Sequence, residues 1–347
     1  MATDELGEVS TTAAEPSQNT AMAAVQNAGP PFDKASADVI LRSADNIDYR
    51  AHRVILSIAS EVFSDMFSLP APSGHDVKIS EGMDQKKDGM PVVAMAEDGR
   101  SLAMLLTFCY PIPQPTPNTI EDIVLGLRLV RKFHLAHIQK PLEMLKIMAQ
   151  REPERVYAIA CTFQLRDVAV SAARSALLTR DDPLLLHPEF GAISSFDLIR
   201  LRRYHVAVLS ALRQTCLNLN WLAVQPSGTG CPFPIILQQP GVFKHVCASA
   251  TCQFRDRPSG YRDCGEGVKI MLKPWVQTYL TATEAALAKR PVPGIASAEN
   301  IKTEVYTGAA GCQSCQGQAL EILPRFAASL AARLETVISQ VELELPF

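Results

Sequence analysis

Hydrophobic and polar residues alternate with different periods along this chain, and each change of period predicts the start of a new element. Residues 1–31 show no apolar periodicity and are rich in Ala, Ser, Thr, Asn, Gln and Pro, which predicts a disordered tail. β-Branched residues predict a strand at residues 37–43 and a return strand at residues 47–51, with a turn at Asp45-Asn46. After its tail, the chain is therefore expected to begin with a β-hairpin.

From His52 onward the apolar residues recur at helical spacing, which predicts one helix with a single buried face. That face consists of Val54, Ile55, Ile58, Val62, Phe63 and Met66. Residues 69–89 are polar and contain Pro and Gly, so we expect an exposed loop there. Residues 91–95 then predict a further strand.

Two more helices follow this strand. Asp98 is suited to cap the first, and the prolines at positions 111, 113 and 115 end it. Asn118, with Glu121 at the third position of a capping box, predicts a helix over residues 120–133. The residues that we expect to be buried in the two helices are Leu102, Leu105, Leu106 and Cys109, then Ile120, Ile123, Val124, Leu127 and Val130.

After about residue 138 the pattern is helical almost throughout. Pro153, Pro274 and a Ser194–Asp197 capping box each mark the first turn of a helix. Residues 226–267 are rich in Pro and Gly and have weak periodicity. Pro324 is expected to kink or restart the last helix. The buried face of that helix is predicted to hold Leu323, Phe326, Leu330, Leu334, Ile338 and Val341.

Several motifs in the first part of the chain resemble the BTB/POZ signature in order and spacing. An Asp-aliphatic strand at residues 38–41 leads to the segment Ala-His-Arg-Val-Ile-Leu at residues 51–56, and Leu-Leu-Thr-Phe-Cys-Tyr follows at residues 105–110. The matching positions in the first helical region are Ala51, His52, Leu56, Ser60, Phe63, Met66 and Phe67. The resemblance covers residues 32 to about 150.

The resemblance implies an α+β fold, in which a BTB/POZ domain with a small sheet and a helical cluster precedes a mostly α-helical extension. Such a domain presents a flat apolar surface that suits pairing with a second copy or with another protein. The resemblance also implies that Asp38 and Arg53 form a charged pocket near the dimer surface. The alternative is that Asp38 only begins a strand and that Arg53 is solvated at a helix start. For His52, a capping or packing role is the simpler interpretation.

Some members of this family recruit a cullin scaffold through a hydrophobic-x-Glu motif in the loop after Met-Phe. In this chain the candidate is Ile79-Ser80-Glu81, inside a loop that is longer and more charged than usual. A role as a substrate adaptor of a cullin-type ubiquitin ligase is therefore an alternative function. So short a motif also arises by chance.

The second half resembles the helical extension of fungal BTB proteins, on short pieces such as residues 152–160 and 201–205. It contains no Kelch, ankyrin or zinc-finger repeat. The predicted organisation is a tail at 1–31, a BTB/POZ domain at 32–150, a helical region at 151–225, an irregular Cys-containing segment at 226–267 and C-terminal helices at 268–347.

The nine cysteines suggest a third possibility. Cys247 and Cys252 are separated by four residues, and Cys312 and Cys315 by two, which are spacings at which turns can direct two thiolates to one zinc ion. A structural zinc that ties the irregular segment to the last helix is therefore possible, and no other cofactor is predicted. The alternative is that these are reduced, partly buried cysteines. Cys109, Cys161 and Cys216 are expected to be small core residues.

Composition narrows the functional class. The net charge of −3, from 33 basic and 36 acidic residues, gives no bulk attraction to nucleic acid or membrane. The start lacks a basic segment followed by an apolar one, so we expect an intracellular protein, in the cytoplasm or nucleus. Phosphate-binding, nucleophile-elbow and metalloprotease motifs are absent from the sequence. The leading prediction is thus a non-enzymatic module that dimerises and recruits partner proteins.

Overall fold

The computed structural model describes residues 24–68, 86–114, 116–178, 187–222, 236–237, 261–263 and 269–347 of the chain. The chain folds as two compact units, Met1–Pro141 and Leu142–Phe347.

The first unit is built on a five-stranded mixed sheet with the strand order β1-β3-β2-β5-β4. β1 and β3 are parallel, as are β2 and β5, whereas β2 and β3, like β4 and β5, are antiparallel. Val39, Ile40 and Leu41 are buried in succession, so both faces of the central strand β2 are covered. The strands are β1 (Gln26–Asn27), β2 (Val39–Arg42), β3 (Ile47–Ala51), β4 (Lys86–Lys87) and β5 (Met90–Ala94).

Four helices complete the core of the first unit: α1 (Arg53–Ala59), α2 (Glu61–Ser68), α3 (Gly99–Cys109) and α4 (Ile120–Lys132). The predicted helix start at Asp98 is confirmed, because the Asp98 carboxylate accepts a hydrogen bond from the Ser101 N–H at 2.8 Å. The buried side chains of this core include Phe32, Leu41, Tyr49, Leu56, Phe63, Leu102, Leu105, Leu106, Phe108 and Phe133.

The single helix predicted after His52 is wrong in two respects. The chain breaks at Ser60, whose extended backbone ends α1 before α2 begins. Two residues of the predicted buried face, Val54 and Ile58, are instead 63% and 83% exposed. The break separates two short helices, whose fully buried residues are Leu56 in α1 and Phe63 in α2.

Two further boundaries also differ from the prediction. The cap of α4 is Thr119 rather than Asn118, and its hydroxyl accepts the Asp122 N–H at 3.1 Å. β1 lies inside the segment predicted as a disordered tail, because its backbone bonds to β3, with Gln26 N–H donating to the Asn46 carbonyl at 2.9 Å. A strand of two residues is too short to show an alternating hydrophobic pattern, so the sequence gives no sign of this pairing.

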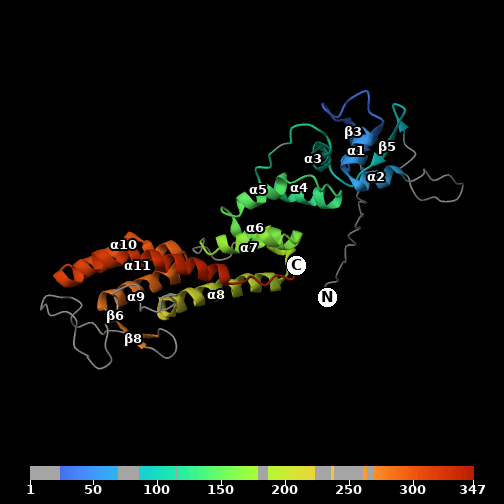
Figure 1. The fold of residues 1–347 in the computed structure, drawn as a ribbon. Coiled ribbons are helices and arrows are strands. Elements are labelled where there is room, and N and C mark those ends of the chain that lie inside the picture. The colour runs from blue at the N-terminus through green and yellow to red at the C-terminus, as the bar shows by residue number, and fades with distance from the viewer. Residues whose placement is uncertain are drawn as a thin grey trace, which may run out of the picture. The chain divides into compact units, whose positions relative to one another are not determined.

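The second unit is mostly helical (Figure 1). Its long helices α8, α9, α10 and α11 pack against one another, and α6 packs against α7. α5 begins just before the division between the units. The bounds are α5 (Lys140–Met148), α6 (Pro153–Phe163), α7 (Arg166–Ser175), α8 (Ser195–Leu217), α9 (Pro274–Lys289), α10 (Glu299–Ala309) and α11 (Gln313–Gln340), with short 3₁₀ turns at Pro188–Ala192, Asn220–Leu222 and Pro293–Ser297.

Several predicted features of this unit are confirmed. Pro153 and Pro274 open α6 and α9, and the Ser194–Asp197 capping box opens α8. The predicted face of α11 is buried at Leu323, Phe326, Leu330, Leu334 and Ile338.

Other features of the second unit were not predicted. Val341 lies just beyond α11, and α11 continues through Pro324 instead of restarting. α10 was not expected. A small antiparallel sheet interrupts the helices, with the order β6-β8-β7 (Ile236–Leu237, Lys269–Leu272, Tyr261–Asp263). The predicted irregular segment lies mostly outside the described residues.

One histidine joins two helices of the second unit. His205 of α8 is half-buried, and its Nε2 lies 3.3 Å from the carbonyl oxygen of Ala173 in α7. Burial lowers the pKa of this imidazole below its ordinary value of 6.5, the nearby Arg202 lowers it further, and the bond to Ala173 opposes both. The folded unit therefore favours a neutral His205.

We expect the stability of the second unit to fall as the pH drops through about 6.5, because the unfolded chain binds the proton more readily than the folded one. One such group contributes at most about 1.4 kcal/mol per pH unit. His205→Gln keeps a donor for Ala173 but does not titrate, so its melting temperature should depend less on pH. Thermal unfolding of both proteins between about pH 5.5 and about pH 7.5 measures this. Equal slopes would contradict the prediction.

Candidate protein interaction surface

The outer face of α1 exposes two large aliphatic side chains, which we call the α1 patch: Val54 and Ile58. They stand four residues apart and therefore lie on one side of the helix. Their exposed fractions are 63% and 83%, and Leu56 is the fully buried side chain of α1. A short helix with so much apolar surface turned outward is typical of a contact with another polypeptide.

The start of α1 is held firmly against the sheet and α3. Asp38, directly before β2, accepts the Arg53 N–H at 2.8 Å, and the Tyr110 hydroxyl accepts the His52 N–H at 2.8 Å. These bonds satisfy two backbone donors that a helix start leaves without partners. The α1 patch is therefore presented by a fixed helix.

The structure brings Asp38 and Arg53 together, but through the backbone of Arg53. The Arg53 guanidinium donates to the Phe67 carbonyl at 2.9 Å and lies 4.9 Å above the Phe67 ring. Among the described residues no ion pair joins the two side chains, and both are exposed. Asp38 therefore caps α1 in the single chain. Its role with Arg53 in a charged pocket at a dimer surface stays a prediction.

Most of the signature residues form the base on which α1 and α2 rest. Ser60 is 1% exposed, and its hydroxyl donates to the Phe133 carbonyl at 2.7 Å. The Phe63 ring stacks on the Phe133 ring with centroids 5.2 Å apart. Ala51 and Leu56 are fully buried, whereas Met66 and Phe67 are partly exposed.

His52 lies between two hydroxyl groups. Its Nε2 is 3.0 Å from the Ser36 oxygen and its Nδ1 is 3.0 Å from the Tyr110 oxygen. Burial raises the pKa of Tyr110, so this phenol keeps its proton and can donate it to Nδ1. His52 thus bridges the Ser36 and Tyr110 hydroxyls beside the start of α1. His52 is the N-cap residue of α1.

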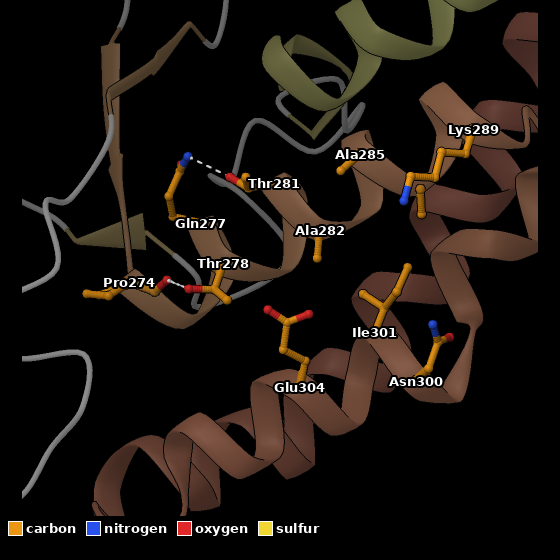
Figure 2. Close-up of a pocket in the computed structure, with 11 residues that line it drawn as sticks. Pro274, Gln277, Thr278, Thr281, Ala282, Ala285, Lys289, Asn300, Ile301 and Glu304 are labelled. Carbon is orange, nitrogen blue, oxygen red and sulfur yellow. Dashed lines mark hydrogen bonds between the residues drawn. The ribbon is translucent and has the colours of Figure 1, made fainter.

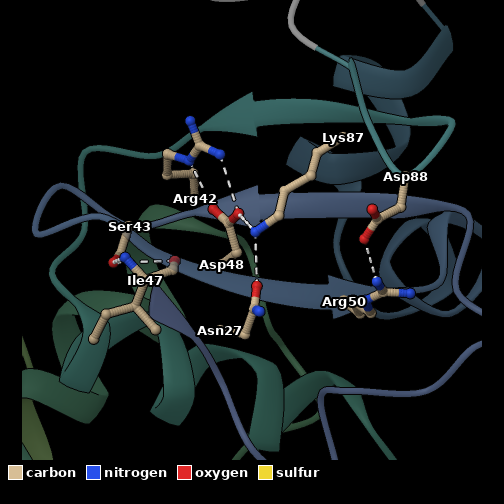
Figure 3. A network of polar contacts seen from close by, with 8 residues as sticks. All are labelled: Asn27, Arg42, Ser43, Ile47, Asp48, Arg50, Lys87 and Asp88. Atoms are coloured by element: carbon tan, nitrogen blue, oxygen red, sulfur yellow. Dashed lines mark hydrogen bonds and ion pairs between the residues drawn. The ribbon is translucent and has the colours of Figure 1, made fainter. Parts of the chain in front are cut away.

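A charged cluster that was not predicted from the sequence joins four strands of the sheet (Figure 3). The Asp48 carboxylate is 2% exposed and accepts bonds from the Arg42 guanidinium at 2.6 and 3.0 Å. The Lys87 ammonium donates to Asp48 and to the Asn27 side-chain oxygen, both at 2.7 Å. Burial alone would raise the pKa of Asp48, but the bonds from Arg42 and Lys87 outweigh it and hold this pKa below its usual value.

The hairpin register could have revealed part of this cluster, because the turn at residues 45–46 places Arg42 directly opposite Asp48. Lys87 belongs to a different hairpin, with β4 and β5, and no local signal links it to Asp48. The cluster connects β1, β2, β3 and β4, and so it stabilises the sheet beneath the interaction surface.

We predict that Asp48→Asn lowers the free energy of unfolding of the first unit by about 2–4 kcal/mol, because two cations lose a buried counter-charge. Asp88→Asn is the matched control, since it removes an ion pair with Arg50 in which Asp88 is 53% exposed (Figure 3). We expect that change to cost about 0–1 kcal/mol. Urea denaturation of both variants measures the difference, and comparable losses would show that Asp48 is not special.

Two of the four predicted zinc ligands, Cys247 and Cys252, lie outside the described residues. Cys312 is 2% exposed at the N-cap of α11, and Cys315 follows in its first turn. Within the described ranges no group of three or more His, Cys, Asp or Glu side chains could hold a metal ion. The zinc site thus stays a prediction, as does the cullin motif Ile79-Ser80-Glu81, which also lies outside the described residues.

The predicted core cysteines Cys109, Cys161 and Cys216 are all buried. Burial raises the pKa of the Cys109 thiol to about 12 and that of Cys161 to about 11. These thiols are therefore protonated at neutral pH, and neither is suited to act as a nucleophile.

The second unit contains a hollow of about 680 Å³ between α9 and α10 (Figure 2). Its wall on α9 is made of small and hydroxyl-bearing residues, and Thr278 donates to the carbonyl of Pro274. Glu304 of α10 and Lys289 of α9 are its charged residues.

A family model of the BTB/POZ domain matches residues 31–150. This match confirms the resemblance drawn from the motifs. No curated protein matches the chain. Among the helices of the described ranges, none combines the length and the hydropathy that a bilayer crossing requires.

Proposed function

Residues 31–150 of this chain are a BTB/POZ domain, and from this premise we propose that the protein is a non-catalytic adaptor that pairs with a second copy through the α1 patch. BTB/POZ domains mediate self-association and partner binding, and this family is generally non-catalytic. The observation that carries the proposal is the exposure of Val54 and Ile58 on one side of α1.

The hydrophobic effect would drive this pairing. Fully burying one aliphatic side chain of this size contributes about 1.5–3 kcal/mol. A two-fold axis beside α1 would place the same patch of each copy against the other, so four such side chains would leave water together. The rest of a stable interface, about 800 Å² on each copy, would come from surfaces around α1.

The anchoring of α1 supports the same proposal. Binding costs less when the contacting residues are already fixed, because little conformational entropy is lost. α1 is held by Asp38 and Tyr110 at its start and by the buried Leu56 along its length. Asp38 and Arg53, both exposed beside the α1 patch, would form part of a charged rim.

We predict that Ile58→Glu converts the full-length protein from a dimer to a monomer, because a carboxylate would have to be desolvated in the apolar contact. Light scattering should give twice the 37.8 kDa of one chain for the unmodified protein and the mass of one chain for the variant. Leu320→Glu is the matched control, since Leu320 is an exposed leucine of the second unit. A monomeric unmodified protein, or a variant that stays dimeric, would refute pairing through α1.

A non-catalytic role is supported by the groups that could have served in catalysis. Burial keeps the Cys109 and Cys161 thiols protonated. We propose that the dimer recruits a partner protein, and the proposal specifies no particular partner. No described residue favours a cullin over another partner.

A further inference from the structure

We propose that the second unit carries a separate docking site, on α8 and α9, for an acidic amphipathic helix of a partner protein. This inference is independent of the pairing through α1, because it rests on different residues of a different unit.

The apolar part of the site is a stripe that we call the α8 face: Phe196, Ile199 and Val206. These residues follow the spacing three and then seven, which places them on one side of a helix. They are 67%, 45% and 55% exposed. Scattered single apolar residues are ordinary on a surface, but three in register along one helix form a contact surface.

The α8 face continues into a groove between α8 and α9. Val206 belongs to both, and the groove holds about 730 Å³. Its other apolar lining residues are Leu209 from α8 and Ala285, Leu287 and Ala288 from α9. Alanines in the wall allow a third helix to approach closely, because their side chains fill little of the space between helices.

The charges beside the stripe determine what kind of helix fits. Arg202 and Arg203 are exposed between Ile199 and Val206, and no ion pair to a described residue involves either of them. Asp197, the single acidic residue of α8, is already used by the Ser194 cap and by Arg200 at 2.7 Å. The α8 face therefore offers cations to a partner and has no anion of its own.

One more ion pair crosses the groove. Arg213 of α8 donates to Glu284 of α9 at 2.8 Å, so this arginine is already paired. Acidic side chains of a partner would hence meet Arg202 and Arg203 near the N-terminal half of α8. Charges of opposite sign at the rim of an apolar contact increase the association rate and select the partner.

Two other occupants fit the surface less well. In a second copy, the same arginines would face each other across the two-fold axis, which like charges oppose. A nucleic acid would satisfy the arginines, but its phosphates would leave Phe196, Ile199 and Val206 in water. An amphipathic helix with leucines on one side and glutamates beside them matches both parts of the surface.

Two fluorescent helical peptides test the site on the full-length protein. Both carry leucines at positions i, i+3, i+7 and i+10, and the flanking residues are glutamates in one and lysines in the other. Fluorescence anisotropy should show saturable binding of the glutamate peptide and binding of the lysine peptide weaker by about tenfold or more. The double variant Arg202→Glu/Arg203→Glu should reverse this preference.

Further variants locate the contact. Val206→Glu should weaken binding of the glutamate peptide by about tenfold or more, because it places a carboxylate in the apolar stripe. Leu320→Glu, on α11, and Ile58→Glu, on α1, should leave it unchanged. Each variant is checked for an unaltered helical circular dichroism spectrum, so that loss of folding is not mistaken for loss of the contact.

Each of the following results would overturn the proposal. They are the absence of saturable binding of the glutamate peptide, equal binding of both peptides, displacement of the peptide by a single-stranded oligonucleotide of similar charge, and a decrease in the mass of the protein's own assembly caused by Val206→Glu. The last result would mean that the α8 face joins copies of this chain. If Ile58→Glu alone abolished peptide binding, the peptide would be occupying the α1 patch instead.

Discussion

The hydrogen bond between the buried Ser60 hydroxyl and the Phe133 carbonyl, 2.7 Å long, fastens the two short helices of the interaction surface to the core. It lies at the break between α1 and α2 and connects that break to the end of α4. α2 buries Phe63, and α1 buries Leu56. Val54 and Ile58 lie on the side of α1 opposite Leu56 and therefore face outward. The exposed patch is thus a consequence of how Leu56 is packed into the core.

The sheet beneath α1 is held by a second constraint, which is electrostatic. Asp48 is nearly inaccessible to water, and two cations from different strands compensate its charge. A buried carboxylate with good partners contributes little net stability compared with an apolar core, but removing one partner is costly. Such a cluster specifies which strands lie together. Helix α1 is therefore held in place by packing and capping, whereas the sheet beneath it is held by charge.

The sequence predicted what is local or repeated and missed what depends on distant contacts. The Asp45-Asn46 turn, the Asp98 cap and the Ser194–Asp197 capping box are short-range patterns, and the structure contains the elements that they predict. The break at Ser60 depends on a residue 73 positions away, so an uninterrupted apolar pattern concealed it. Asn118 and Thr119 are both good caps, and sequence rules do not choose between neighbours. The exposure of Val54 and Ile58 is invisible to periodicity, because an interface and a core select the same residues.

The two outer strands of the first sheet suggest why association would proceed through helices. In the described part of the sheet, both β1 and β4 are only two residues long, and they carry Gln-Asn and Lys-Lys. Short edges with lysines discourage the addition of a further strand from another molecule, since few backbone groups are available and the like charges repel. A protein whose function is to bind others must also avoid uncontrolled polymerisation. Here the edges of the sheet limit growth, and contact is left to surfaces of defined shape.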